Sequence, residues 1–314
     1  QGARRQPVRR AAVVGVPEFR GAQAGADRAG AGRRAGADRS VVRRVAAAGF
    51  GGSGAADRAA YGLGCRLLGH GDSPAAVECL LGGLAVRARG RVVVTLTGAP
   101  ASAVLDGRPV PHAAVLELSD GAELALGTPT SGLRTYLCVR GGLDVPPVLG
   151  SRSTDTLSGT GPAPLAVGDV LAVGPAPASF PHVDHAAVSS PPHGEVVLDA
   201  LPGPRSRWVG GLDAVTRAAW VVGPDSDRVG VRLRPTGAPV ERVAAHRDVE
   251  LPSEGMVRGA VQLPPGGEAV VFLADHPVTG GYPVVAVLTD ASADRAAQLR
   301  PGQPVRLRAA PAVR

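Results

Sequence analysis

Residues 91–107 read RVVVTLTGAPASAVLDG, and this stretch decides the fold class. Two short runs lie on either side of a Gly-Ala-Pro break: Arg91–Thr97, which is rich in β-branched residues, and Ser102–Leu105. The pair Asp106-Gly107 then supplies a turn signal. Short runs of this kind between turn residues predict β-strands.

The same pattern continues along the chain. Further strands are predicted over Leu84–Arg87, Val115–Leu118, Thr135–Val139, Glu195–Leu198, Val229–Leu233, Ala269–Leu273, Val284–Leu288 and Pro304–Arg308. Strands spaced about ten residues apart are typical of a β barrel or sandwich. Short helices are predicted over Ala55–Leu68, with Ser53 as N-cap, and over Asp213–Trp220 and Ala293–Gln298. The predicted fold class is therefore mainly β with a few short helices.

The distribution of charge argues against a nucleic-acid-binding protein. The net charge of +7 comes wholly from residues 1–58, which hold twelve arginines and four acids, whereas the remaining 22 arginines face 23 acids. All basic residues are arginine, which indicates a GC-rich genome rather than selection for phosphate contacts. No stripe of basic and aromatic residues follows residue 60, so nucleic-acid binding is not predicted.

Cysteine use and hydropathy indicate the compartment. Cys65, Cys79 and Cys138 have neither CxxC spacing nor an even number, so reduced, buried thiols are expected. No apolar stretch is long enough to span a membrane, and the N-terminus lacks the apolar core of a signal peptide. A cytoplasmic protein is expected.

The chain divides into four predicted parts. Residues 1–50 form an atypical low-complexity segment of Arg, Ala and Gly. Residues 51–180 are predicted to be a first β-rich lobe and 194–310 a second one. Between them, residues 181–193 are rich in Pro, Ser and His and read as a linker. The linker histidines do not have metal-ligand spacing, and no metal site is predicted.

Two clusters of polar residues lie in predicted loops, where the hydrophobic core does not explain their presence. Strand 135–139 leads into Gly141-Gly142 and then a loop with Arg152, Ser153 and Asp155. Glycines let backbone N–H groups approach a ligand, and arginine can grip a carboxylate bidentately. A solvated turn with an internal Arg–Asp pair is the alternative. The second cluster, Asp227-Arg228, precedes a strand. The alternative to a binding role there is a capped turn with a surface ion pair.

Two more clusters lie in the second lobe. Ser253 and Glu254 precede a glycine, and Glu254 is a candidate general base or an ordinary loop acid. Asp275 is followed by Thr279-Gly-Gly-Tyr282, which resembles a shaped pocket wall. The chain has no phosphate-binding loop, serine-hydrolase elbow or zinc-protease motif.

Taken in order, five motifs resemble the KipA-type family, also called allophanate hydrolase subunit 2 or the biotin-dependent carboxyltransferase family. They are SGAADR (53–58), SGLRTYLCVRGGLDVPPVLGSRSTDT (131–156), SDRVGVRL (226–233), ELPSEGMVRGAVQLPPGG (250–267) and LADHPVTGGYPVVA (273–286). The resemblance implies a cyclophilin-like β-barrel architecture. It also implies a KipI-type (allophanate hydrolase subunit 1) partner and a LamB/YcsF-type subunit, in a complex that opens 5-oxo-L-proline to L-glutamate at the expense of ATP.

The resemblance leaves alternatives open. Fused relatives transfer a carboxyl group from carboxybiotin to urea, so biotin enters only in that interpretation. A non-catalytic regulator of a KipI-type partner is the third hypothesis. The family's opening TVQDxGRxG phrase is absent, and a frame slip or wrong start upstream of about residue 50 is the simplest hypothesis for residues 1–50.

The predicted site roles follow from residue chemistry at the matching motifs. Glu254 and Asp275 are the candidates for proton transfer, and Arg152, or else Arg228, for recognition of the substrate carboxylate. The full predicted substrate-binding set is Arg152, Ser153, Asp155, Asp227, Arg228, Ser253, Gln262, Thr279 and Tyr282. The loops that carry these residues are expected to converge on one shared cavity.

Overall fold

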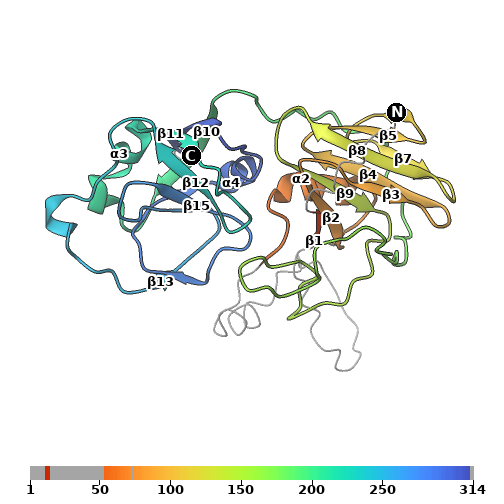
Figure 1. Cartoon of the computed structure of the whole chain (residues 1–314), viewed down its shortest axis with the longest axis horizontal. Coiled ribbons are helices and arrows are strands. Elements are labelled where there is room, and N and C mark those ends of the chain that lie inside the picture. The colour runs from red at the N-terminus through yellow and green to blue at the C-terminus, as the bar shows by residue number, and fades with distance from the viewer. Residues whose placement is uncertain (1–10, 15–52, 72–73, 312–314) are drawn as a thin grey trace, which may run out of the picture.

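The structure is a computed structural model that describes residues 11–14, 53–71 and 74–311. It is mainly β, as predicted, and its strands form two bodies that lie side by side (Figure 1). Of residues 1–50, only the backbone of 11–14 is described, so the hypotheses about the rest of that segment lie outside the described residues.

The first lobe consists of two antiparallel sheets. One has the order β1 (Ala11–Val14), β2 (Ala76–Leu80), β9 (Arg134–Val139), β4 (Val92–Gly98) and β7 (Val115–Leu118). The other has the order β3 (Ala85–Arg87), β8 (Glu123–Pro129), β5 (Ala101–Leu105) and β6 (Arg108–Val110). Leu96 and Leu137 of the larger sheet share a buried core with Leu124 of the smaller one, so the two sheets pack face to face.

The helix α2 (Arg58–Leu67) covers the other face of the larger sheet. Tyr61 and Cys65 of α2 pack against Tyr136 and Cys138 of β9 in a separate buried cluster. Strand β9 is therefore buried on both faces, and all of its residues are buried. Neighbouring β2 is almost as buried, which explains why no alternating pattern predicted it.

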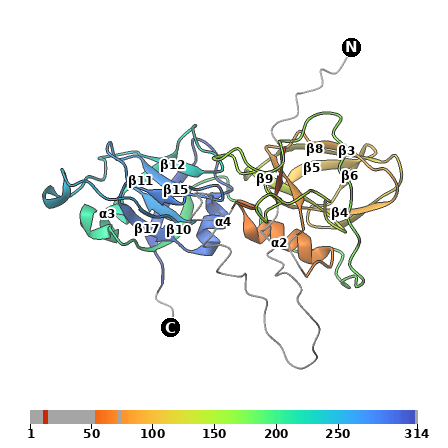
Figure 2. The same ribbon diagram turned by 90° about the horizontal axis from the view of Figure 1, so that it is seen from below.

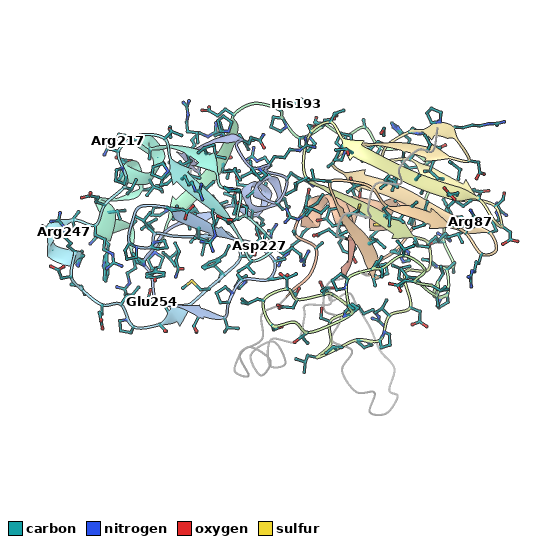
Figure 3. The ribbon with its side chains drawn as sticks, viewed as in Figure 1. Arg87, His193, Arg217, Asp227, Arg247 and Glu254 are labelled. Atoms are coloured by element: carbon teal, nitrogen blue, oxygen red, sulfur yellow. The ribbon has the colours of Figure 1, made fainter. Side chains whose placement is uncertain are left out.

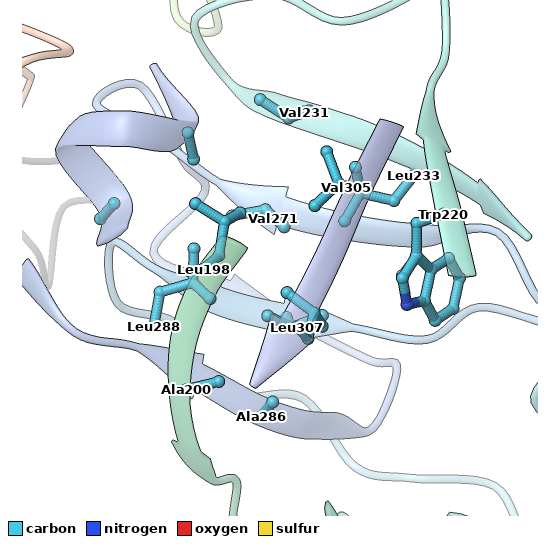
Figure 4. Packing of buried hydrophobic residues seen from close by; sticks show 14 of the residues in the cluster. Leu198, Ala200, Trp220, Val231, Leu233, Val271, Ala286, Leu288, Val305 and Leu307 are labelled. Atoms are coloured by element: carbon cyan, nitrogen blue, oxygen red, sulfur yellow. The ribbon is translucent and has the colours of Figure 1, made fainter. Parts of the chain in front are cut away.

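The second lobe is a closed seven-stranded barrel. Its order is β10 (Val196–Pro202), β17 (Val284–Leu288), β14 (Ala260–Gln262), β15 (Ala269–Phe272), β12 (Gly230–Pro235), β11 (Ala219–Val222) and β18 (Pro304–Ala309). Aliphatic side chains such as Leu198, Leu233 and Leu307 fill the barrel (Figure 4). The buried Trp220 indole donates to the carbonyl of Val215 at 3.2 Å, which satisfies its only polar group.

The remaining elements of the second lobe lie outside the barrel strands. They are η1 (Ser206–Val209), α3 (Leu212–Arg217), η2 (Ala244–His246), α4 (Asp290–Ala296) and the two-stranded sheet of β13 (Glu254–Gly255) and β16 (Thr279–Gly280). The predicted helix 213–220 was too long, because its last residues belong to barrel strand β11. The predicted N-cap was also wrong: Asp57, and not Ser53, caps α2.

The segment between the lobes contains no named strand from Arg140 to Glu195. The predicted lobe and linker boundaries within it stay a prediction. The three cysteines are buried and free, which confirms that expectation. Within the described residues, no helix has the length and apolar character to cross a membrane.

Candidate functional site

A network of buried charges joins the two lobes. The guanidinium of Arg228, which precedes β12, donates from Nε and Nη2 to the two carboxylate oxygens of Asp275, at 2.9 Å each. Its Nη1 donates to Oε1 of Glu78 on β2 at 2.6 Å. Arg134 on β9 lies against the same Glu78 oxygen, with its Nε 3.3 Å away. Two arginines and two carboxylates therefore form a neutral cluster across the lobe junction.

Mutual pairing keeps these buried groups ionised. Burial by itself would lower the pKa of Arg228, but the charges of Glu78 and Asp275 raise it above its ordinary value. Burial would likewise raise the pKa of Glu78, but Arg228 and Arg134 bring it below the usual range. Removing one partner of such a buried pair strands a charge in a low-dielectric interior, which costs about 3–5 kcal/mol.

Asp275 is the best-satisfied member of the network. It is fully buried, and besides Arg228 it accepts from the hydroxyl of Ser53 at 2.6 Å. The backbone N–H and the hydroxyl of Thr156 donate to its other oxygen at 2.9 and 2.8 Å. Five donors occupy both carboxylate oxygens, so these contacts favour a structural role for Asp275.

The predicted loop residues of the first lobe lie around this network. The Ser153 hydroxyl is buried 3.3 Å from that of Ser53. Asp155 is also buried, and its Oδ1 accepts from the backbone of residues 157 and 158, so it stabilises its own turn. Arg152 donates from Nε to the carbonyl of Val145 at 2.8 Å. This loop is thus held largely by its own contacts and by Asp275.

Asp227 lies beside the network without joining it through its side chain. Its Oδ1 accepts from the backbone N–H groups of Val229 and Gly230, at 2.8 and 3.0 Å. The carboxylate therefore forms the turn that leads into β12 and fixes the backbone that carries Arg228.

The other predicted residues form a second group at the edge of the barrel. Glu254 on β13 makes a bidentate ion pair with Arg205. Strand β13 pairs with β16, which carries Thr279. The Gln262 amide donates to the carbonyl of Tyr282 at 2.9 Å, and the Tyr282 side chain is exposed. Ser253, next to Glu254, is exposed as well.

The structure therefore separates the predicted residues instead of bringing them to one cavity. Figure 3 shows Asp227 at the lobe junction and Glu254 at the far lower edge of the barrel. The junction group comprises Ser153, Asp155, Asp227, Arg228 and Asp275, with Arg152 in the same loop as the first two. The edge group comprises Ser253, Glu254, Gln262, Thr279 and Tyr282.

A cavity of about 580 Å³ lies between the lobes, and none of the predicted residues lines it. Helix α2 and the end of β4 form one side, and α4 with the start of β10 forms the other. Residues 188–192 also line the cavity. Figure 2 shows α2 and α4 next to each other at the junction. The lining residues are Asp57, Ala59, Ala60, Leu63, Arg66, Thr97, Gly98, His112, Val188, Ser189, Ser190, Pro191, Pro192, Val196, Ala291, Asp294, Arg295, Gln298, Leu299 and Gln303.

Among the described residues that line this cavity, Asp57 is one of two carboxylates, with Asp294, and neither was predicted as a site residue. Only 7% of Asp57 is exposed, and its oxygens accept from the Ala60 N–H at 2.9 Å and the Gln298 amide at 2.7 Å. Burial raises its pKa to about 6; nearby Asp294 adds to the rise, and Arg258 opposes it. A carboxylate that titrates near neutrality is suited to proton transfer or to accepting an N–H from a ligand.

Gln298 holds Asp57 from the other lobe. Its Oε1 accepts from the backbone N–H groups of Leu133 and Arg134, both at 2.9 Å, so its amide nitrogen must face Asp57. The signal for Asp57 in the sequence was its place in the SGAADR motif, which was used for the family resemblance and for the start of a predicted helix, and not for a site residue. Its burial depends on residue 298, which is distant in sequence.

No cluster of three or more His, Cys, Asp or Glu side chains that could hold a metal ion occurs among the described residues.

Comparison with known proteins places the chain in a family. The family model described as "Carboxyltransferase domain, subdomain A and B" matches residues 48–309. The chain belongs to this family. The resemblance seen in the sequence motifs is thereby confirmed.

Relatives in this carboxyltransferase family include proteins with different names. The C component of the 5-oxoprolinase of Escherichia coli K12 is 35% identical over 257 residues, which cover 80% of each chain. The protein of the same name from Haemophilus influenzae is 30% identical over 82% of each chain. The urea amidolyase of Saccharomyces cerevisiae is 29% identical over 81% of this chain but only 15% of its own length.

Solved structures agree on the fold. The crystal structure of TTHA0988 matches with a TM-score of 0.77 at 28% identity, covering 97% of this chain. The chain spans 54% of the length of TTHA0988. The K. lactis urea amidolyase also matches with a TM-score of 0.77, at 23% identity, over 96% of this chain and 18% of that protein. The barrel-containing, mainly β fold is therefore shared with carboxyltransferase-family proteins.

Proposed function

We propose that this chain is a subunit of an ATP-dependent 5-oxoprolinase complex, which opens the lactam ring of 5-oxo-L-proline to give L-glutamate. In this proposal it acts with a KipI-type and a LamB/YcsF-type subunit. The amide C–N bond of the ring breaks, and water supplies a hydroxyl to the carbonyl carbon and a proton to the nitrogen. Hydrolysis of ATP to ADP and phosphate drives the ring opening.

The observation that carries the proposal is the similarity to the C components of bacterial 5-oxoprolinases. The match to the E. coli protein extends over the same large share of both chains, at 35% identity. The match to the urea amidolyase of S. cerevisiae covers a small part of a much longer protein. A subunit that handles a small polar amide is also consistent with a cavity between two lobes, where ligand sites commonly lie.

The helix N-termini of this chain are poorly suited to phosphate. Phosphate groups bind at helix N-termini, where backbone N–H groups are free and the helix dipole is positive. In the part of the chain that the structure describes, each α-helix has an acid there: Asp57 caps α2, and Asp213 and Asp290 lie in the first turns of α3 and α4. These carboxylates would repel phosphate at the helix N-termini, and ATP is assigned to the complex as a whole.

The roles predicted for individual residues remain hypotheses. Glu254 and Asp275 were assigned to proton transfer, and Arg152 or Arg228 to the substrate carboxylate. The contacts of Arg228 and Asp275 favour a role in joining the lobes. Glu254 is partly exposed beside Arg205, so it is the predicted acid that a ligand or partner can reach.

The test is reconstitution. The chain is purified with its KipI-type and LamB/YcsF-type neighbours, and glutamate release from 5-oxo-L-proline is measured with and without ATP. We expect ATP-dependent release that requires all three proteins. Activity of the two partners that this chain does not increase would refute the proposal.

The family description favours a second candidate, carboxyl transfer from carboxybiotin to urea or a related amide. This chain contains no lysine to carry biotin, so the reaction would need a separate carrier and a biotin carboxylase. Urea-dependent loss of the carboxyl group from a carboxylated carrier protein, stimulated by this chain, would favour it over the first. A LamB/YcsF-type gene nearby favours oxoprolinase, and a carrier gene favours carboxyl transfer.

A further inference from the structure

The cavity between α2 and α4 has walls that suit the body of a small organic ligand. Its apolar lining comes from both lobes and from residues 188–192, and includes Leu63, Val188, Pro191, Val196 and Leu299. Its volume of about 580 Å³ falls within the range of ordinary ligand sites. The walls alone set no orientation, so the polar groups decide what binds.

Several polar groups on the walls already bind protein partners. Asp294 binds Arg258 at 2.6 Å, and Arg295 binds Asp199 at 3.1 Å. The Thr97 hydroxyl donates to a backbone carbonyl at 2.7 Å. The amide groups of Gln298 and Gln303 also bind the backbone. These contacts fix the side chains in the cavity walls.

Arg66 and Asp57 are charged groups of the lining that keep capacity for a ligand. The guanidinium of Arg66, in the last turn of α2, makes no hydrogen bond or ion pair with any described residue. Asp57, at the other end of the same helix, uses each carboxylate oxygen once, and each oxygen can accept a second bond. One end of the cavity therefore offers a cation, and the other offers a hydrogen-bond acceptor.

We propose that this cavity is the substrate site, and that it takes a small carboxylic acid with an amide or ureido N–H. Asp57 accepts the N–H, Arg66 binds the carboxylate, and the apolar walls hold the carbon skeleton. The choice of 5-oxo-L-proline as the first ligand rests on the proposed function. Its lactam N–H and its carboxylate are the two groups that this arrangement recognises.

The burial of Asp57 supports this assignment. Because Gln298 presents its amide nitrogen, and Ala60 its backbone N–H, the protein surrounds Asp57 with donors and leaves it an acceptor. Its pKa of about 6 keeps it ionised at neutral pH. An ionised acceptor in a largely apolar site strengthens a hydrogen bond from an amide N–H.

The experiment uses the reconstituted complex and measures equilibrium binding of labelled 5-oxo-L-proline without ATP, and then KM with ATP. Ala59→Trp fills the cavity from an exposed position on α2, and Ala85→Trp is its control on an exposed position of β3. Arg66→Gln removes the cation, and Arg87→Gln is its exposed control. Unchanged circular dichroism and unfolding midpoints verify that the variants fold.

We expect Ala59→Trp to abolish binding and Arg66→Gln to weaken it about 10-fold to 100-fold, as loss of a charged hydrogen bond does. The two controls should bind like the wild type. Normal binding and KM in Ala59→Trp would overturn the cavity assignment while leaving the proposed function intact.

If the wild-type complex releases no glutamate, the same variants are tested for thermal stabilisation by N-carbamoylglycine, an acid with a ureido N–H. Stabilisation that Ala59→Trp removes would support the cavity and refute only the oxoprolinase reaction. If neither 5-oxo-L-proline nor N-carbamoylglycine stabilises the wild type, the cavity assignment is overturned too.

Discussion

The buried charge network makes a quantitative prediction. Replacing Arg228 by Met keeps an unbranched apolar stem but removes the guanidinium and its four hydrogen bonds: two to Asp275, one to Glu78 and one to the Gly54 carbonyl. Two buried carboxylates then face the single guanidinium of Arg134. Leaving a buried charge without its partner costs about 3–5 kcal/mol, so we expect a loss of that size in the free energy of unfolding.

The matched control is Arg234→Met. Arg234 also pairs with two acids, Asp225 at 3.3 Å and Glu268 at 3.0 Å, but its side chain is 49% exposed. Exposed pairs contribute about 0–1 kcal/mol, so this variant should lose no more than that. The comparison separates the effect of burial from the effect of losing an arginine with two partners.

The assay is urea unfolding, followed by tryptophan fluorescence and by circular dichroism. Both tryptophans belong to the barrel lobe, so fluorescence reports on that lobe, and coincident transitions would show that the lobes unfold together. The deficit of Arg228→Met should shrink as pH falls, because protonation of a carboxylate removes the uncompensated charge. Equal losses in Arg228→Met and Arg234→Met would refute the reasoning.

Three further predictions concern single residues. Glu254→Gln should change the free energy of unfolding by less than about 1 kcal/mol, because its ion pair is partly exposed. If Glu254 transfers a proton, the same variant should lower kcat of the complex about 100-fold or more. An unchanged kcat refutes that role. Because the folded pKa of Asp57 is raised from 3.8 to about 6, its contribution to stability should fall by about 2 kcal/mol as pH rises from 4 to 6. Asp57→Asn should lack that decrease in urea titrations across this range, and parallel profiles would contradict the raised pKa. Gly82→Ala should lower the free energy of unfolding by more than about 2 kcal/mol, since its Cβ would lie 2.0 Å from the Gly127 carbonyl oxygen. Its control is Gly90→Ala, where φ is also positive but no atom lies near the added Cβ, and the loss in the same urea assay should be about 1 kcal/mol.

Much of the fold was accessible to sequence reasoning. Strands β7 (Val115–Leu118) and β17 (Val284–Leu288) begin and end where predicted. Strand β7 alternates between buried and less buried residues, and β17 is a continuous aliphatic run, so both signals lie in residues that are neighbours along the chain. Strand β2 (Ala76–Leu80) was missed because Glu78 interrupts its short apolar run, and the arginines that allow Glu78 to be buried come from distant segments.

The site was accessible only in part. The motifs drew attention to Arg228 and Asp275, which do meet, but their role could not be inferred without Glu78. Glu78 lies in the missed strand β2, 150 residues from Arg228. The burial of Asp57 could not be inferred from the sequence for the same reason, because its partner Gln298 is 241 residues away.

The sequence by itself determined that this chain is a mainly β member of a carboxyltransferase family, because strand patterns and motifs are local properties of the chain. Only the tertiary structure decided which polar residues lie together. It buried Arg228 among acids, left Glu254 at the barrel edge and placed Asp57 in a cavity between the lobes. Burial and the pairing of charges depend on contacts between residues far apart in sequence, and these set both the pKa values and the ligands that a site can bind.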